Sequence, residues 1–430
     1  MPFRTLFSSA RTPAIALLAT TLTLAFAATL QAQVLSNPRV AEFDPSPDHR
    51  VVLESGEPAV VRYELAVYLQ GAPAPFATVD MGKPSPDPDG KIRFDFSAQS
   101  AAWPLPGGDY EARVNAVGPQ GAASSSPSNP FTFTDLKNDV LWRHATTGEV
   151  WVWPIEGAAR VTETRVETVE DVGYRIVGVA DFTGDGRADL LWHHATRGEV
   201  WIWPMNGTAR LGETRVGTVP DTGYRIAGTG DYNGDGKTDI LWHHATRGDV
   251  WVWLMNGTAM VSETKVATVP DAGYRIVGSG DFNRDGRADI LWHHATTGQV
   301  WVWLMNGAAR ISETRVGTVA DLGYQVVGVA DYTGDGRMDI LWHHATRGEV
   351  WIWPMAGTER VTETRVGTVP DTDYQIVGTG DYNGDRRPDI LWHHATRGEV
   401  WVWVMNGTTM VSETKVATVP DPSYQIITAK

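Results

Sequence analysis

The chain has 430 residues, of which 42% are hydrophobic and 20% are charged. This length allows more than one domain, and the composition is that of ordinary soluble globular proteins. The formal net charge of −15 makes nucleic acid and anionic membrane surfaces poor partners, and the absence of cysteine excludes a disulfide framework and a lipid-modified cysteine anchor.

Residues 1–32 have the features of a secretory signal peptide. Arg4 and Arg11 precede the apolar run AIALLATTLTLAFAATL, which ends near small residues. We expect cleavage after Ala32 and a mature chain that is secreted, periplasmic or on the cell surface. The alternative is a retained membrane anchor. Because the run is short for a membrane span and no second apolar segment follows it, we expect no membrane insertion after signal cleavage.

Residues 37–134 contain no repeat and alternate in short runs such as AVVRYELAVYL, KIRFDF and DYEARVNAV. Pro- and Gly-rich turns separate these runs, a pattern that predicts a β-sandwich. The stretch WPLPGGDYEARVNAVGPQGAASSSPSNPFTF resembles the last two strands of a fibronectin type III domain, with Tyr110 as the corner tyrosine after Leu105 and Pro106. The resemblance implies a spacer or docking module.

From Asp135 to Lys430 the sequence repeats every 50 residues. Each of six units contains four short β-rich runs joined by tight turns, including Asn-Gly pairs such as Asn256-Gly257. This pattern predicts one four-stranded blade of a β-propeller per unit, and the Trp/Val alternation excludes a helical repeat. The predicted fold is therefore all-β, a six-bladed β-propeller after the β-sandwich. The repeat is marked by the tryptophans at positions 142, 192, 242, 292, 342 and 392.

The two ends of the array are complementary. The first unit begins at Asp139 without its tyrosine-led strand, whereas the chain ends with that strand, YQIITAK. We therefore expect residues 424–430 to complete the first blade and close a ring of six, which leaves no terminal repeat to cap. The alternative is a seven-bladed ring in which residues 131–135 begin the first blade and a partner supplies the rest.

Five Asp-rich turns follow the first run of five units, as in DYNGDGKTD at residues 231–239. Side chains at positions 1, 3, 5 and 9 of each turn, with the backbone carbonyl at position 7, offer only oxygen ligands, several of them charged. This is the chemistry that Ca²⁺ prefers. The alternative is an Asp/Asn/Gly turn without metal. The predicted metal ligands are Asp181, Thr183, Asp185, Arg187, Asp189, Asp231, Asn233, Asp235, Lys237, Asp239, Asp281, Asn283, Asp285, Arg287, Asp289, Asp331, Thr333, Asp335, Arg337, Asp339, Asp381, Asn383, Asp385, Arg387 and Asp389.

The motif Asp-x-[Asp/Asn]-x-Asp-Gly-x-x-Asp between two strands resembles the FG-GAP or VCBS repeat family of integrin-α-like β-propellers, over residues 139–430. The resemblance implies four to five bound Ca²⁺ ions. The last loop has Arg386 where glycine is wanted, so its turn is strained or altered. The first unit keeps only Asp135 and Asp139, and we expect it to hold no ion. Because the carboxylates of each loop repel one another, we expect the metal-free form to be looser.

The strand Trp-His-His after each loop has two interpretations. Adjacent strand residues point to opposite faces, so His243 and His244 cannot bind one ion, whereas Trp251 and Trp253 share a face and are expected to pack between blades. In the alternative, tryptophan and histidine at the blade edges form a ring of equivalent sugar-binding pockets, as in propeller lectins. The candidate ligand-binding residues are Trp192, His194, Trp242, His244, Trp292, His294, Trp342 and His344.

These features favour a secreted, Ca²⁺-stabilised binding or adhesion protein without catalytic activity, whose repeated weak sites act through multivalency. Its expected partner is a glycan or an extracellular protein. The array has no unique cluster of acid, base and nucleophile. The alternatives are a polysaccharide-degrading enzyme or its accessory subunit, and a structural scaffold that docks proteins.

Overall fold

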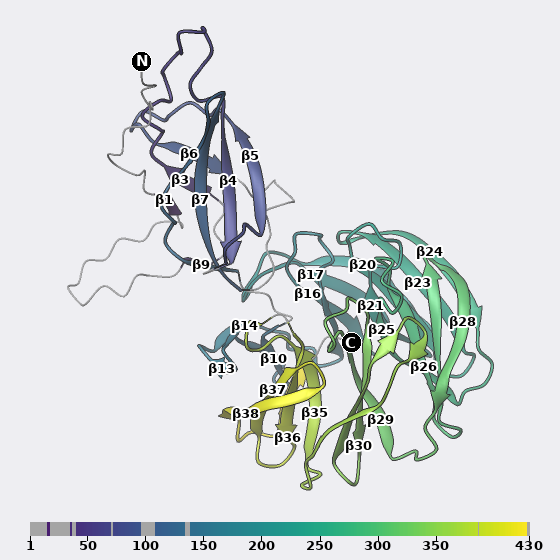
Figure 1. Ribbon diagram of the computed structural model, residues 1–430. Coiled ribbons are helices and arrows are strands. Elements are labelled where there is room, and N and C mark those ends of the chain that lie inside the picture. Colours follow the sequence, from purple (N-terminus) through teal and green to yellow (C-terminus); the bar gives the residue numbers. More distant parts are fainter. Residues whose placement is uncertain are drawn as a thin grey trace. The chain divides into compact units, whose positions relative to one another are not determined.

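The computed structural model describes residues 15–17, 35–36, 40–69, 72–95, 108–133, 138–385 and 387–427. They form strands and turns in two compact units, Met1–Thr134 and Asp135–Lys430 (Figure 1). Within these described ranges no helix has the length and apolar character needed to cross a bilayer. The predicted signal peptide lies outside the described residues except for Ile15–Leu17, which form strand β1 and pair with β3.

The first unit consists of two sheets. The smaller has the strand order β1-β3-β6, and the larger has the order β2-β9-β7-β4-β5, with β8 paired to β7. The predicted alternating runs become β4, β6 and β7. The strands are β1 (Ile15–Leu17), β2 (Leu35–Ser36), β3 (Val40–Phe43), β4 (Arg62–Leu69), β5 (Ala77–Gly82), β6 (Ile92–Asp95), β7 (Gly108–Gly118), β8 (Gly121–Ser124) and β9 (Phe131–Phe133).

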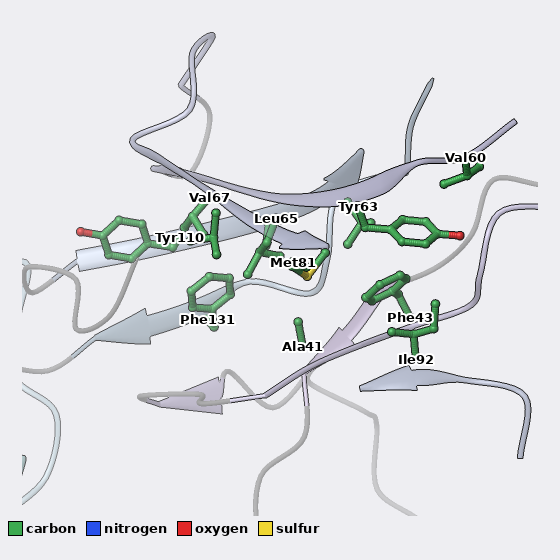
Figure 2. Packing of buried hydrophobic residues seen from close by; sticks show 13 residues of the cluster. Ala41, Phe43, Val60, Tyr63, Leu65, Val67, Met81, Ile92, Tyr110 and Phe131 are labelled. Carbon is green, nitrogen blue, oxygen red and sulfur yellow. The ribbon is translucent and has the colours of Figure 1, made fainter. Parts of the chain in front are cut away.

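One hydrophobic core joins the two sheets. Ala41, Phe43 and Ile92 of the smaller sheet pack in the same cluster as Tyr63 and other residues of β4, β5, β7 and β9 (Figure 2). Tyr110, the predicted corner tyrosine, is fully buried in this core. Strand β9 pairs with β7 and β2, so Phe131–Phe133 belong to the first unit. The alternative in which these residues begin a seventh blade is therefore wrong.

Within its described residues, the second unit contains six four-stranded antiparallel sheets, which we number 1 to 6 in chain order. In sheet order, the strands of sheets 1 and 2 are β14 (Thr164–Thr168), β11 (Glu149–Trp153), β10 (Val140–His144) and β39 (Tyr424–Ile427), and then β15 (Tyr174–Ala180), β16 (Asp189–His194), β17 (Glu199–Trp203) and β20 (Thr214–Thr218). Sheets 3 and 4 consist of β21 (Tyr224–Gly230), β22 (Asp239–His244), β23 (Asp249–Asn256) and β24 (Ala259–Thr268), and then β25 (Tyr274–Gly280), β26 (Asp289–His294), β27 (Gln299–Asn306) and β28 (Ala309–Thr318). Sheets 5 and 6 consist of β29 (Tyr324–Ala330), β30 (Asp339–His344), β31 (Glu349–Trp353) and β34 (Thr364–Thr368), and then β35 (Tyr374–Gly380), β36 (Asp389–His394), β37 (Glu399–Asn406) and β38 (Thr409–Thr418).

The outer hairpin of each sheet is continuous or interrupted according to one residue. Sheets 3, 4 and 6 have Leu254, Leu304 and Val404 after the Trp-x-Trp pair, and their outer strands run unbroken. The other three sheets have proline there, which lacks a backbone N–H and breaks the ladder. Their hairpin tips are separate two-stranded pieces, namely β12 (Ile155–Glu156) with β13 (Ala159–Arg160), β18 (Met205–Asn206) with β19 (Ala209–Arg210), and β32 (Met355–Ala356) with β33 (Glu359–Arg360).

Each sheet packs against the next through a separate hydrophobic cluster. In one example, Leu191 and Ile202 of sheet 2 lie against Trp242 and Trp253 of sheet 3. The same arrangement joins sheets 1 and 2, 3 and 4, 4 and 5, and 5 and 6. A sixth cluster joins sheet 6 to sheet 1. Both faces of every sheet are therefore buried, as the alternation of large apolar side chains on both sides of the strands requires.

The two ends of the array meet in sheet 1. Strand β39 pairs antiparallel with β10, with Trp142 opposite Ile426 and His144 opposite Tyr424. Tyr424 also donates a hydrogen bond from its hydroxyl to Glu149, at 2.8 Å. The strand that the first repeat lacks is thus supplied by the last residues described, as its sequence predicted.

Candidate calcium loops and the tryptophan–histidine strands

The five Asp-rich loops connect the first and second strands of sheets 2 to 6. Neighbouring loops are joined by backbone hydrogen bonds, because Thr238 donates its N–H to the carbonyl of Asp181 at 3.0 Å and Ala288 donates to Asp231 at 2.7 Å. Met338 donates to Asp281 in the same way, at 3.2 Å. These bonds join the loops of sheets 2 to 5 in series, whereas Pro388 in the loop of sheet 6 has no N–H to donate to Asp331.

The first aspartate of each loop organises the turn around its own carboxylate. Asp231 accepts backbone N–H groups from Gly234 (2.7 Å), Asp235 (3.2 Å) and Gly236 (2.7 Å). Asp235 in turn accepts the N–H of Lys237 at 2.9 Å, which brings positions 5 and 7 together. Asp181 and Asp331 accept the same three groups in their own loops, and Asp281 and Asp381 accept two of them.

Position 3 differs between loops, as the sequence predicted. Asn233 accepts the N–H of Asp235 and donates its amide to the Asp235 carboxylate at 3.1 Å, so the two predicted ligands lie side by side. Asn283 and Asn383 make the same pair of contacts. In the loop with Thr333, the backbone N–H of this residue donates to the carboxylate of Asp339, at 2.9 Å. The threonine loops therefore bring a weaker neutral oxygen to the site.

The aspartate at position 9 has a structural role that the sequence analysis missed. Asp239 is fully buried, and its carboxylate accepts the N–H of Tyr232 (3.0 Å) and of Met255 (2.7 Å). It thus ties the loop to the outer hairpin of its sheet. The equivalent bond to the hairpin is made by Asp189, Asp289, Asp339 and Asp389. In sheet 1, Asp139 accepts the N–H of Ile155 at 3.1 Å, although that unit does not have the full set of predicted ligands.

Burial makes these position-9 carboxylates unusually difficult to ionise. Burial, together with a smaller contribution from the other loop carboxylates, raises the pKa of Asp239 to about 6 and that of Asp289 to about 7. Asp189, Asp339 and Asp389 have pKa values raised by the same cause. A cation beside the loop favours the ionised form, since opposite charge lowers a carboxyl pKa. The available donors are oxygen atoms of carboxylates, of amides or hydroxyls, and of the backbone. This set of donors fits Ca²⁺.

The carboxylates of a loop are near one another without forming a closed cage. Among the described residues, no loop brings three carboxylate side chains within 4.8 Å of one another. Basic side chains lie over some loops, for example Lys237 beside Gly184 and Arg284 beside Gly336. Calcium would be held by the side chains at positions 1, 3, 5 and 9, together with the carbonyl at position 7. Arg386, the predicted departure in the last loop, lies outside the described residues.

These loops require positive φ at two positions, and Arg284 occupies one of them. Positions 4 and 6 have positive φ and are glycine in most loops, such as Gly234 (78°) and Gly236 (81°). Arg284 occupies position 4 of its loop at φ 62°, a conformation that costs a non-glycine residue about 1 kcal/mol. We expect Arg284→Gly to raise the free energy of unfolding by up to about 1 kcal/mol, as measured by urea denaturation. Gly234→Arg should lower the free energy of unfolding. Equal stabilities for both variants would contradict the requirement for positive φ at position 4.

One group of three potential metal ligands lies outside these loops. Asp371, Asp373 and His394 approach within 4.8 Å of one another. His394 accepts backbone N–H groups from Thr396 (3.3 Å) and Arg397 (3.0 Å) on Nδ1, so its proton is on Nε2, which faces Asp371 at 3.2 Å. Asp371 also pairs with the Arg397 side chain at 2.9 Å. This nitrogen has no lone pair for a metal, and the group is a structural hydrogen-bond network.

The Trp-His-His strands form the interior of the array. Trp242 packs on Trp253 of its own sheet, with ring centroids 4.9 Å apart, and against the edge of His193 from the preceding sheet at 5.4 Å. His244 uses Nδ1 to accept backbone N–H groups from Thr246 and Arg247, which fixes the following turn. In sheet 1 the first histidine is replaced by Arg143, which lies over Trp192 at 5.5 Å.

The assignment of this strand to a ring of sugar pockets stays a prediction. The candidate residues have exposed fractions of only 1–5%, because each sheet covers them with the next. They are Trp192, His194, Trp242, His244, Trp292, His294, Trp342 and His344.

The first histidine of each strand gives the fold an acid-sensitive contact. Burial lowers the pKa of His243, and the neighbouring His244 and Arg275 lower it further. The unfolded chain then binds a proton below about pH 6.5 that the folded chain does not bind, so stability falls as the pH falls below that value. In saturating calcium, we expect His243→Gln to lose less stability than the natural chain between pH 7.5 and 5.5, by urea denaturation. An identical loss would show that His243 does not contribute.

The geometry defines the second unit as a β-propeller repeat fold, in which four-stranded antiparallel sheets pack face to face. The chain contains FG-GAP-like repeats: the model of the FG-GAP-like repeat matches residues 181–242 and 231–292. These two matches include the loops that begin at Asp181, Asp231 and Asp281. The sequence matches no curated protein.

Solved structures with a similar fold have low identity to this chain. A chain of a nidogen/laminin complex is 11% identical, covers 64% of this chain and 92% of its own, and has a TM-score of 0.44. A streptogramin B lyase is 8% identical with coverages of 66% and 85% and a TM-score of 0.40. The β-propeller domain of Cps50 (Swd1) from Myceliophteria thermophila is 12% identical with coverages of 66% and 85% and a TM-score of 0.37. Since all three scores are below 0.5, the fold assignment rests on the sheets themselves.

Proposed function

We propose that the second unit is a closed six-bladed β-propeller, and that the first is a fibronectin type III-like β-sandwich. The pairing of β39 with β10 and the cluster between sheets 6 and 1 support closure of the ring. The two sheets with a shared core and the buried Tyr110 support the sandwich. With residues 1–32 as a signal peptide, the protein is secreted, periplasmic or on the cell surface.

The five loops of sheets 2 to 6 are proposed to bind Ca²⁺, four or five ions per chain. The oxygen-only donor set and the raised pKa values of the position-9 aspartates support this assignment. Because the loops of sheets 2 to 5 are bonded to one another, calcium bound at one of them stabilises the neighbouring blades as well. Each ion neutralises carboxylates that otherwise repel, as in other extracellular modules that bind calcium with a Kd of about 10⁻⁴ to 10⁻³ M.

The proposed function is that of a non-catalytic binding or adhesion module for an extracellular ligand. The observation that carries it is the sixfold repetition of surface positions on equivalent sheets. One example is the exposed aliphatic residue at Val161, Leu211, Val261, Ile311, Val361 and Val411. A surface presented six times converts weak contacts into strong multivalent binding. Catalysis instead requires an acid and a base in different environments, and equivalent sheets give equivalent environments.

Binding to an array of extracellular glycans and matrix proteins tests this function. The mature chain from Gln33 should bind a multivalent surface at least 10²-fold more tightly than the same ligand in monomeric form, about the gain that multivalency provides. Hydrolysis or elimination products from a polysaccharide would instead establish the enzyme. A folded chain that binds no array component would identify a structural scaffold.

A further inference from the structure

Hollows open at three successive junctions between the sheets of the second unit. They lie between sheets 6 and 1, sheets 1 and 2, and sheets 2 and 3, with volumes of about 240, 490 and 140 Å³. Each is lined by the tryptophan of the second strand, both tryptophans of the Trp-x-Trp pair, and the end of the outer strand of the preceding sheet. Equivalent residues therefore form each hollow.

The hollow between sheets 1 and 2 combines an aromatic wall with polar groups. Trp192, Trp201 and Trp203 line it. Trp192 is only 2% exposed, and its Nε1 is buried without a hydrogen-bond partner. Trp142 and Trp242 line the other two hollows, and their Nε1 atoms are also buried without a partner. A buried N–H group without an acceptor costs about 1–3 kcal/mol, so a ligand oxygen that reaches one of these atoms would gain a hydrogen bond.

Charged groups at the same hollow balance one another. The Arg210 guanidinium lies over Trp203 at 4.6 Å and pairs with Glu213 at 2.8 Å. It also reaches Glu167 of the preceding sheet, at 3.2 Å. Two carboxylates and one guanidinium therefore line the opening. They offer hydrogen-bond donors and acceptors together, and they disfavour an anionic ligand.

A neutral sugar matches this combination. Its apolar C–H face stacks on an indole ring, and its hydroxyl groups both donate and accept, as the carboxylates and the guanidinium require. An apolar ligand would form no hydrogen bond with the charged groups at the opening, and an anion would face Glu213 and Glu167. We propose that each inter-sheet hollow binds one neutral sugar residue of an extracellular glycan. This inference rests on the proposed binding function and places its site at the sheet junctions.

The six junctions fall into two kinds. Four have arginine over the second tryptophan of the pair, at centroid distances of 4.3–4.6 Å, namely Arg160, Arg210, Arg310 and Arg360. In the other two, Met260 and Met410 occupy that position. Methionine supplies no donor to a hydroxyl group. The three hollows comprise two arginine sites and one methionine site. Extended over the repeat, the proposal gives four arginine sites and two methionine sites, which differ in affinity for the same sugar.

Isothermal titration calorimetry with neutral methyl glycosides tests this assignment. With the methyl glycosides of glucose, galactose, mannose and fucose as probes, at least one should bind with two classes of site in a ratio of four to two. Arg210→Met should change the ratio to three to three. Trp201→Phe should weaken one site about tenfold, since it reduces the aromatic surface at the hollow. Sialic acid, which is anionic, should bind at least tenfold more weakly than the neutral probe.

Val52→Ala is the control, because Val52 belongs to the first unit and is 63% exposed. It should leave all six sites unchanged. Glycoside binding that is insensitive to Arg210→Met and Trp201→Phe would overturn this location while retaining a binding function. Binding to a deglycosylated matrix protein without glycoside binding would overturn the sugar inference alone. A folded chain that binds neither would overturn both proposals.

Discussion

Removing calcium with a chelator is expected to lower the unfolding temperature of the second unit by at least about 10 °C, as measured by differential scanning calorimetry. At about 10 mM calcium, a loop with a Kd of about 10⁻⁴ to 10⁻³ M gains about 1.4 to 2.7 kcal/mol from mass action. Four of the five loops are bonded in series, because the backbone carbonyls of Asp181, Asp231 and Asp281 each accept a bond from the next loop. Their contributions therefore add within one cooperative structure.

Asp235→Asn separates a calcium ligand from a simple turn residue. Asparagine keeps an oxygen that can accept the N–H of Lys237 but removes one negative charge beside Asp231 and Asp239. In calcium, the variant should bind one ion fewer and unfold at a lower temperature. In chelator, it should be as stable as the natural chain or slightly more stable, because less like charge remains in the loop. Equal destabilisation in both buffers would identify the loops as turns that hold no metal.

Most of the second unit could be predicted from sequence because its information is local. The period of 50 residues, the Asn-Gly turns and the alternation of Trp and Val define short antiparallel strands, and each such sheet repeats the last. The pairing of Tyr424–Ile427 with β10 could also be predicted, since the first unit of the repeat lacks one strand. No comparable repetition constrains residues 37–134, where the sequence indicated only the strands.

The candidate sites were harder to predict, because they depend on contacts between sheets. Strand alternation shows that Trp242 and His243 face opposite sides, but both sides are covered by other sheets. The contact of His193 with Trp242 joins residues on different sheets, and no local pattern reveals it. One signal was present: Asp139 is retained in the unit without a complete loop, which indicated that position 9 also serves the fold.

Deleting residues 424–430 is expected to destroy the stability of the ring, since the chain would then end at Ser423. The backbone pairs between β39 and β10 would be lost, together with the side chains of Tyr424 and Ile426, which pack in the cluster between sheets 6 and 1. Strand β10 would become an open edge, and such edges pair with other chains. We expect the unfolding temperature to fall by at least about 10 °C, and light scattering to show oligomers.

A variant that ends at Ile427 keeps every described pair of β39 and serves as the matched control. It should unfold at the same temperature as the natural chain. Adding a peptide of residues 420–427 to the shorter variant should restore part of the stability in a concentration-dependent manner, because the strand then binds as a separate ligand. Asp421, which faces His144 at 3.3 Å, remains in the shorter variant, so the peptide restores the strand itself. If the shorter variant were as stable and as monomeric as the control, the pairing of the two ends would not hold the propeller closed, and the packing of sheet 6 on sheet 1 would have to suffice.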